Sequence, residues 1–390
     1  MEKKSKNSII YAVSLVAMFA LVVVMEQVIK PTDSMAMLLT VLKKGAVYML
    51  VAVSMNLLNG FTGLFSLGQA GFMLLGSYTY AIFTIPQADR GMVYKYYDCI
   101  VNISFPEVLG NAMGGFGMLI GWIIAIILAG LVAAGVAYMI GLPVLRLKSD
   151  YLAIATLGFA EIIRAIFQWG KLGPVTNGSN PLKNYIRLNT FQLKLGDTVI
   201  GLTTLVPILL ATVCIGIIVM LVNSSYGRAF KAIREDEIAA EAMGISLYKH
   251  KQLSFCISSF FAGVGGAMLA MFAGTVQANN FKAAMTYEIL LIVVLGGIGS
   301  ITGSCIGAML FIAASEWWLR GLDSGVFLGI QAPALFRNGF RLVVFSVIIM
   351  TVVLFFRKGI MGDKELPDLV RALRQKFSAG KTKAGENHGG

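Results

Sequence analysis

Long apolar runs alternate with short polar segments along most of the chain. A helix needs about 20 predominantly apolar residues to cross the hydrocarbon core of a bilayer. We predict membrane-spanning helices at residues 9–28, 45–58, 71–85, 118–140, 151–169, 200–222, 253–273 and 342–356. A further region, 287–318, is apolar but interrupted by glycines, so it either crosses twice or enters and returns. The pattern predicts an all-α polytopic membrane protein with about eight to ten crossings.

The composition agrees with a membrane protein. Of the 390 residues, 57% are hydrophobic and 13% are charged, whereas a typical soluble domain has about 25% charged residues. The chain has 4 cysteines, none in a CxxC spacing, and 2 histidines. This pattern argues against a disulfide framework and against a histidine-based metal centre, so we expect no metal and no cofactor bound by this chain.

The formal net charge of +12 is distributed unevenly along the chain. Lysine and arginine gather in residues 1–8, 224–252 and 357–390, and cytoplasmic segments of membrane proteins carry such an excess. We expect a cytoplasmic N-terminal tail, a transmembrane domain over 9–356 with 224–252 as a cytoplasmic loop, and a basic cytoplasmic tail with a disordered end. Acidic residues outnumber basic ones in 86–117, which favours the outside. Basic flanks of membrane spans indicate lipid, not nucleic acid, as the partner.

Two glycine-rich regions, one in each half of the chain, look like interrupted helices. Unwound backbone at membrane depth is tolerated only where it is buried or lines a water-filled cavity, and matching interruptions in two repeats point to a transport pathway. The candidate pathway residues are Asn56, Asn59, Gly60, Gly63, Ser66, Gly68, Gln69, Glu161, Gly296, Gly297 and Gly299. The alternative is that the glycines only permit close helix packing. An inverted repeat relating the two regions is a hypothesis.

Two further features of the apolar runs bear on function. Gly299, Gly303 and Gly307 are four residues apart, which would place them on one helix face suited to packing. Glu161 and Arg164 are three apart and share a helical face. They either neutralise each other inside the bundle and mark function, or lie near the end of their span and snorkel toward water.

Residues 226–251, YGRAFKAIREDEIAAEAMGISLYKHK, form the densest charge cluster of the chain. Good helix formers without proline predict one helix over 227–243, with Ser224 or Ser225 at its start and Gly244 in the left-handed conformation at its end. The residues expected on one side are Phe230, Ile233, Ala240, Met243 and Gly244.

Small residues give this helix a flat side that fits the groove of another protein. They are Ala239, Ala240, Ala242 and Gly244. The neighbouring acids argue against a helix lying on lipid, which favours bulky apolar residues and few acids. A solvated loop is the remaining alternative, and protein docking is favoured.

The same stretch resembles the cytoplasmic coupling loop in permease subunits of branched-chain amino acid ABC importers, of the LivM type. Three further segments resemble that family, in the family's order: MNLLNGFTGLFSLGQAGF, LRLKSDYLAIATLGFAEIIRAIF and YEILLIVVLGGIGSITGSCIGAML. Together they span about residues 51–310, which is most of the chain. Residues 86–117 and the tail after Lys364 look longer than in a typical subunit.

The resemblance implies a type II-like importer permease fold, whose loop docks into a groove of an ATPase and transmits nucleotide-driven movement to the membrane helices. Glu237, Ala240, Glu241 and Gly244 match the core of that loop, and Gly227, Arg228 and Ile233 complete the candidate coupling residues. The implied partners are a second homologous permease in a heterodimer, two ABC ATPase subunits that bind ATP and Mg²⁺, and an external substrate-binding protein. The implied location is the cytoplasmic membrane of a prokaryote, with both termini inside.

We therefore expect a transport subunit that catalyses no covalent reaction and moves branched-chain amino acids. Urea, amides or another small polar solute are the near alternative. The more distant alternatives are an ion-coupled transporter, in which Glu161 titrates, and a membrane scaffold. The tail sequence Gly380-Lys381-Thr382 does not form a phosphate-binding loop, because Gln375 occupies the position where that motif needs glycine.

Overall fold

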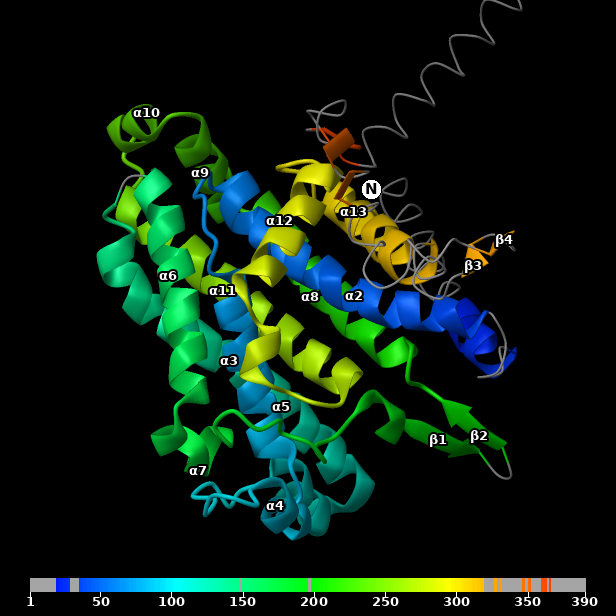
Figure 1. Ribbon diagram of the computed structural model, residues 1–390. Helices are drawn as coiled ribbons and strands as arrows, with labels where there is room; N and C mark the ends of the chain where they lie inside the picture. Colours follow the sequence, from blue (N-terminus) through cyan, green and yellow to red (C-terminus); the bar gives the residue numbers. More distant parts are fainter. Residues whose placement is uncertain are drawn as a thin grey trace, which may run out of the picture.

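The computed structural model describes residues 19–28, 35–147, 149–195, 198–318, 326–327, 330–331, 346–347, 350–351, 359–362 and 365 (Figure 1). Its helices are α2 (Ala36–Asn56), α3 (Gln69–Thr84), α4 (Gln87–Val93), α5 (Phe105–Val144), α6 (Ser149–Gln168), α7 (Gly173–Thr176), α8 (Leu205–Asn223), α9 (Ser225–Glu235), α10 (Glu237–Ala242), α11 (Leu247–Ala273), α12 (Ala283–Gly296) and α13 (Ile301–Ala313). Two π-helices, η1 (Leu57–Phe61) and η5 (Ala314–Trp318), extend α2 and α13. The predicted tail 1–8, most of the span 342–356 and most of the tail 357–390 lie outside the described residues.

Several helices have the length and composition of membrane spans. In the part of the chain that the structure describes, five qualify: Ala36–Phe61, Phe105–Val144, Tyr151–Gln168, Leu205–Asn223 and Leu247–Ala273. Phe19–Val28, Ala283–Gly296 and Ile301–Trp317 are shorter apolar helices. The expected all-α polytopic architecture is confirmed, and the inverted repeat stays a prediction.

Some predicted boundaries are wrong for identifiable physical reasons. The span predicted from residue 200 begins at Leu205, because Thr198–Gly201 forms strand β2, which pairs antiparallel with β1 (Gln192–Leu195). A second short pair joins β3 (Val326–Phe327) to β4 (Ile330–Gln331).

The segment 86–117, which was predicted as a loop, contains helical stretches. It holds α4 and the first part of α5, in which two helical segments meet at Gly114 (φ 66°, ψ −148°). Glycine adopts this backbone conformation without the steric cost of a Cβ atom. Residues 105–113 therefore form a separate helical segment that turns back against the predicted span, since a methyl group on Gly121 would lie 2.5 Å from the carbonyl oxygen of Phe105.

Helices α3, α5 and α11 pack together, and α2 packs against α8, α11, α12 and α13. Glycines allow the close approach: a methyl group on Gly266 of α11 would lie 2.0 Å from the carbonyl oxygen of Met73 on α3. At the same place the hydroxyl of Ser77 donates to the carbonyl oxygen of Gly266 at 2.7 Å. In a bilayer, such backbone packing and interhelical hydrogen bonding replace the hydrophobic drive for association.

The two ends of the bundle carry different elements. Figure 1 shows α9 and α10 at one end, and α4, α7 and the β1–β2 hairpin at the other. At the second end, Leu182 and Val276 pair through their backbones and the hydroxyl of Tyr185 donates to Ala270 at 2.8 Å. Burial raises the pKa of the Tyr185 phenol, so that this donor keeps its proton. These contacts fix the end of α11 that lies farthest from α9 and α10.

The contact between α3 and α11 predicts the effect of Gly266→Ala. The added methyl group meets backbone that cannot rotate away, so we expect a loss of roughly 1–3 kcal/mol of stability, seen as a lower unfolding temperature in detergent by fluorescence-detected size exclusion. Gly135→Ala on α5 is the matched control, since a methyl group there meets nothing within 4 Å. Equal unfolding temperatures for the two variants would contradict the packing argument.

Candidate coupling site

The charged stretch forms two helices, so the prediction of one helix over 227–243 is wrong. Asp236 lies between α9 and α10 in an extended conformation (φ −158°, ψ 113°). One of its carboxylate oxygens accepts hydrogen bonds from the backbone N–H groups of Ile238 (2.8 Å) and Ala239 (3.0 Å). Aspartate stabilises a helix start in this way, and here it starts α10. The predicted left-handed end is confirmed, because Gly244 has a φ of 84°.

The inner side of the two helices is partly as predicted. Phe230, Ile233 and Ala240 are buried, and a methyl group on Gly227 would lie 2.1 Å from the carbonyl oxygen of Val222. Met243 was expected on this side but is 83% exposed, because the break at Asp236 reorients the residues after it. The small-residue patch is not one surface, since Ala240 faces inward while Ala239, Ala242 and Gly244 are exposed.

The outward side of α10 is apolar at its tip and acidic beside it. Ile238 and Met243 are each 83% exposed, and Glu237 and Glu241 flank them. Glu237 also binds Lys251 of α11, with 2.6 Å between Oε2 and Nζ. The sequence analysis did not include Ile238 among the candidate residues. The available signal was a single isoleucine among acidic residues. Arg228 donates to the hydroxyl of Ser225 at 3.0 Å on the exposed side of α9.

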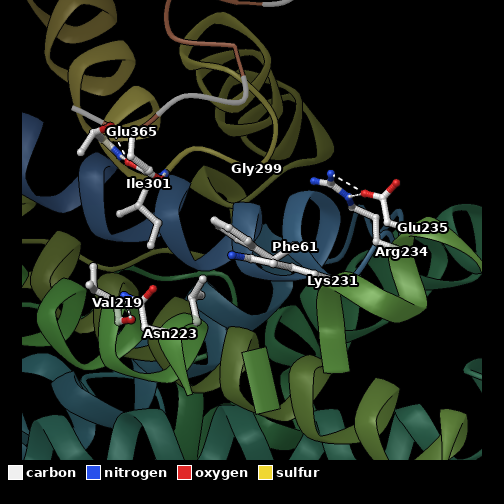
Figure 2. Close-up of a pocket in the computed structure, with 11 residues that line it drawn as sticks. Phe61, Val219, Asn223, Lys231, Arg234, Glu235, Gly299, Ile301 and Glu365 are labelled. Atoms are coloured by element: carbon white, nitrogen blue, oxygen red, sulfur yellow. Dashed lines mark hydrogen bonds and ion pairs between the residues drawn. The ribbon is translucent and has the colours of Figure 1, made fainter. Parts of the chain in front are cut away.

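Arg234 joins this loop to the membrane helices. Its Nη1 donates to the carbonyl oxygen of Gly60 at 2.9 Å, and its Nη2 donates to Glu235 at 2.9 Å. A methyl group on Gly299 would lie 2.8 Å from Nη1. Figure 2 shows the guanidinium of Arg234 paired with Glu235 beside the turn that carries Gly299. One side chain of α9 thus touches both glycine-rich regions.

The first glycine-rich region is a true helix break. After η1 the chain runs without helix from Thr62 to Gly68 and then enters α3. Side chains satisfy its backbone: Asn59 accepts from the N–H of Ser66 at 3.1 Å, Thr156 of α6 accepts from Leu67 at 3.0 Å, and Thr286 of α12 accepts from Ala70 at 3.1 Å. Gln69 donates to the hydroxyl of Ser54 at 2.6 Å. Ser66, Gly68 and Gln69 are buried, and Gly63 is exposed with a φ of 75°.

The second region is a turn between two short helices. Gly297 (φ 118°) and Gly299 (φ 90°) lie between α12 and α13. Gly299 therefore does not share a helix face with Gly303 and Gly307, which corrects that prediction. Gly303 does pack closely, since a methyl group there would lie 2.3 Å from the carbonyl oxygen of Gly296, and one on Gly307 would lie 3.1 Å from the Gly296 Cα.

Asn56 joins the two breaks. Its side chain is fully buried at the end of α2. The amide nitrogen donates to the carbonyl oxygen of Ser300 (2.9 Å) and the hydroxyl of Ser304 (2.8 Å), and the amide oxygen accepts from the N–H of Gly299 (2.9 Å). A methyl group on Gly60 would lie 1.8 Å from that amide oxygen. Asn56, Gly60, Gly296, Gly297 and Gly299 thus meet at one junction, which we call the break junction.

Glu161 lies elsewhere, at the opposite end of α12. Its Oε2 accepts from the Nε of Arg164 at 2.6 Å, so the predicted pairing is confirmed. Its Oε1 accepts from the backbone N–H of Ala283 at 3.2 Å, at the first residue of α12. A carboxylate at a helix N-terminus is favourable. Oε1 of Glu161 therefore joins α6 to α12, and Oε2 pairs with Arg164 within α6.

A cavity of about 550 Å³ opens beside the break junction (Figure 2). It is lined by Phe61, Val219, Val222, Asn223, Lys231, Arg234, Glu235, Gly299, Ile301, Thr302 and Glu365. Lys231 lies over the ring of Phe61, 5.5 Å from its centre. Glu365 accepts from the backbone N–H groups of Ile301 (2.7 Å) and Thr302 (3.1 Å) at the start of α13. Residues of α2, α8, α9 and α13 thus surround one space.

Comparison with known proteins identifies a family whose model this chain matches. Residues 37–356 match the family model described as branched-chain amino acid transport system / permease component. The chain is 32% identical over 292 residues to the high-affinity branched-chain amino acid transport system permease protein LivM of Salmonella typhimurium, covering 69% of this chain and 61% of that protein. It is 25% identical over 279 residues to the probable LivM of Methanocaldococcus jannaschii (68% and 76% covered) and 23% identical over 337 residues to LivH of Escherichia coli (83% and 93% covered). The chain therefore spans about 61% of the length of the Salmonella relative, and no solved structure matches it.

The buried amide of Asn56 predicts the result of Asn56→Leu. Leucine has a similar volume but removes the acceptor of the Gly299 N–H, at a cost of about 1–3 kcal/mol, and takes one donor from the Ser300 carbonyl, which keeps those of Ser304. We expect a clear fall in unfolding temperature in detergent. Asn223→Leu serves as the control, since the Asn223 amide is exposed and bonds only to the preceding turn at Val219. An Asn56 variant as stable as this control would refute the role given to the amide.

Proposed function

The chain belongs to the family of permease components of branched-chain amino acid transport systems, and from this premise we propose that it is one half of the membrane pathway of an ABC importer for branched-chain amino acids. The relatives named LivM and LivH support this assignment. The chain moves its substrate without covalent chemistry, and ATP and Mg²⁺ bind to partner ATPase subunits.

The hydrogen bond from Arg234 to Gly60 is the observation that carries the proposal. It connects α9 to the end of η1, and Asn56 connects the same region to the turn between α12 and α13. Because Gly60 and Gly299 both lie at helix breaks, a displacement of α9 reaches two membrane helices through direct contacts. Movement at the charged loop is therefore transmitted where the helices are already interrupted.

The tip of α10 is proposed as the surface that an ATPase subunit covers. Exposed Ile238 and Met243 suit burial in a groove of another protein. Glu237 and Glu241 at the rim add charge complementarity, which favours orientation and association rate. Gly244, with open space around it, lets the chain turn back toward α11 beneath the docked partner.

The orientation follows from the same proposal. Residues 224–252 and both termini face the cytoplasm, and the end with α4, α7 and the 86–117 segment faces outward. Residues 9–356 form the permease domain, with the basic tail 357–390 on the inside. The complex comprises this chain, a second homologous permease, two ATPases and an extracytoplasmic binding protein, in the cytoplasmic membrane of a prokaryote.

Coupling is tested with Arg234→Met in the complete importer reconstituted in proteoliposomes. Methionine keeps the length of the side chain and removes its donors, so ATP hydrolysis is retained while leucine uptake per ATP falls roughly tenfold or more, as expected for losing about 1.5–3 kcal/mol of a charged hydrogen bond. Lys249→Met, at an exposed position of the first turn of α11, is the control. Normal leucine uptake by the Arg234 variant would overturn the coupling role. Uptake of urea but not leucine by the wild-type importer would replace branched-chain amino acids by urea as the proposed substrate.

Glu161→Gln separates an ATP-driven importer from an ion-coupled transporter. Glutamine still accepts the Ala283 N–H but loses the charge that pairs with Arg164, so we expect a small loss of stability, on the order of 1 kcal/mol for a partly exposed pair. Leucine uptake should remain ATP-dependent and indifferent to an imposed proton gradient. Loss of uptake with intact ATP hydrolysis would instead assign Glu161 a titrating role.

A further inference from the structure

Charged side chains also gather on α2, α12 and η5, far from the break junction. Lys44 of α2 pairs with Glu316 of η5, with 2.5 Å between Nζ and Oε1, and the two side chains are 23% and 19% exposed. Glu288 lies exposed on α12, between apolar residues. A charged residue costs about 2.5–3.5 kcal/mol at the centre of a membrane helix, and such residues face protein or a water-filled cavity and mark substrate pathways.

These charges border a second cavity, of about 390 Å³. It lies between α2, the last turn of α11, the segment after α11 and the first turns of α12. Its lining includes Lys44, Tyr48, Phe272, Lys282, Met285 and Glu288. The size falls within the range of about 300–1,000 Å³ found for small-molecule sites, and the mixture of apolar walls with few polar groups is typical of them.

The cavity lies toward the outer end of the bundle. Its α11 residues begin at Leu269, 22 residues after the helix starts at Leu247 beside the charged loop, a distance of about 33 Å along the helix. A solute arriving from outside would meet this space before it reached the break junction.

The charges of the cavity match a zwitterion. Lys44 is neutralised by Glu316, which leaves Lys282 and Glu288 as one cation and one anion. Within the described residues neither of these two side chains makes a hydrogen bond or ion pair, so both retain their capacity to bind. An amino acid presents an ammonium and a carboxylate on one carbon, whereas urea and other neutral amides present neither charge.

We propose that this cavity is an entry subsite for the amino acid substrate. The carboxylate of Glu288 accepts hydrogen bonds from the substrate ammonium, the ammonium group of Lys282 binds its carboxylate, and Phe272 and Met285 contact its aliphatic side chain. The assignment rests on the proposed function. It places recognition on α2 and α12, the two helices whose inner ends meet at the break junction.

The first test is Glu288→Gln in the reconstituted importer with saturating binding protein. We expect leucine uptake per ATP to fall about tenfold, with complex assembly unchanged. Tyr287→Phe is the matched control: it also removes one polar group from α12, at a neighbouring position that is 48% exposed and outside the cavity. Uptake by the Glu288 variant equal to that of the control would overturn the subsite.

The second test uses thiol labelling and does not depend on turnover. Glu288→Cys and Tyr287→Cys are compared after Cys99, Cys214, Cys256 and Cys305 have been replaced by serine. A membrane-impermeant methanethiosulfonate applied from outside should label position 288, and leucine should slow that labelling severalfold while position 287 is unaffected. Labelling at 288 that leucine does not slow refutes the subsite. Failure of the wild-type importer to take up leucine at all would refute the proposed function instead.

Discussion

The side-chain amide of Asn56 makes it possible for two helices to end close together inside the protein. Hydrocarbon offers no partner for an unwound N–H or C=O group, so each such group needs one within the protein. Asn56 supplies both a donor and an acceptor to the turn after α12, while Asn59, Thr156 and Thr286 supply partners to the break before α3. The glycine-rich regions are therefore closed by side chains of neighbouring helices, and their amides are engaged in holding the fold.

This closure determines how motion can pass through the molecule. The break junction lies at the ends of α2 and α12 nearest α9, and the same two helices border the second cavity at Lys44 and Glu288. Between Gly296 and Glu288 there are 8 residues of regular helix, about 12 Å of rigid rod. In the proposed coupling, a shift of Arg234 against Gly60 tilts elements whose far ends line the proposed subsite. The link is a set of direct contacts between named groups, which is a physical basis for coupling.

Hydropathy predicted the helices well, and local chemistry explains where it failed. Apolar length identified the long spans, and glycine content identified both breaks, because both signals act within one segment. Asp236 ended α9 through a cap that competes with helix continuation, and the strand pairing before α8 depends on a partner segment. Lys44 was overlooked because its charge lies in an apolar run and its partner, Glu316, is 272 residues away. Pairing over that distance cannot be read from residue spacing.

The contrast between Glu161 and Glu288 lies in how their carboxylate oxygens are engaged, which residue type alone does not predict. Glu161 of α6 and Glu288 of α12 both lie near the start of α12, and the sequence left open whether Glu161 marks function or snorkels toward water. Glu161 uses both oxygens, one on Arg164 and one on the helix terminus at Ala283. Glu288 is exposed beside the second cavity and makes no hydrogen bond or ion pair among the described residues, so its carboxylate can accept hydrogen bonds from a cation. A polar group whose partners are all present stabilises the fold, whereas one that faces open space with its capacity unused is available to a substrate.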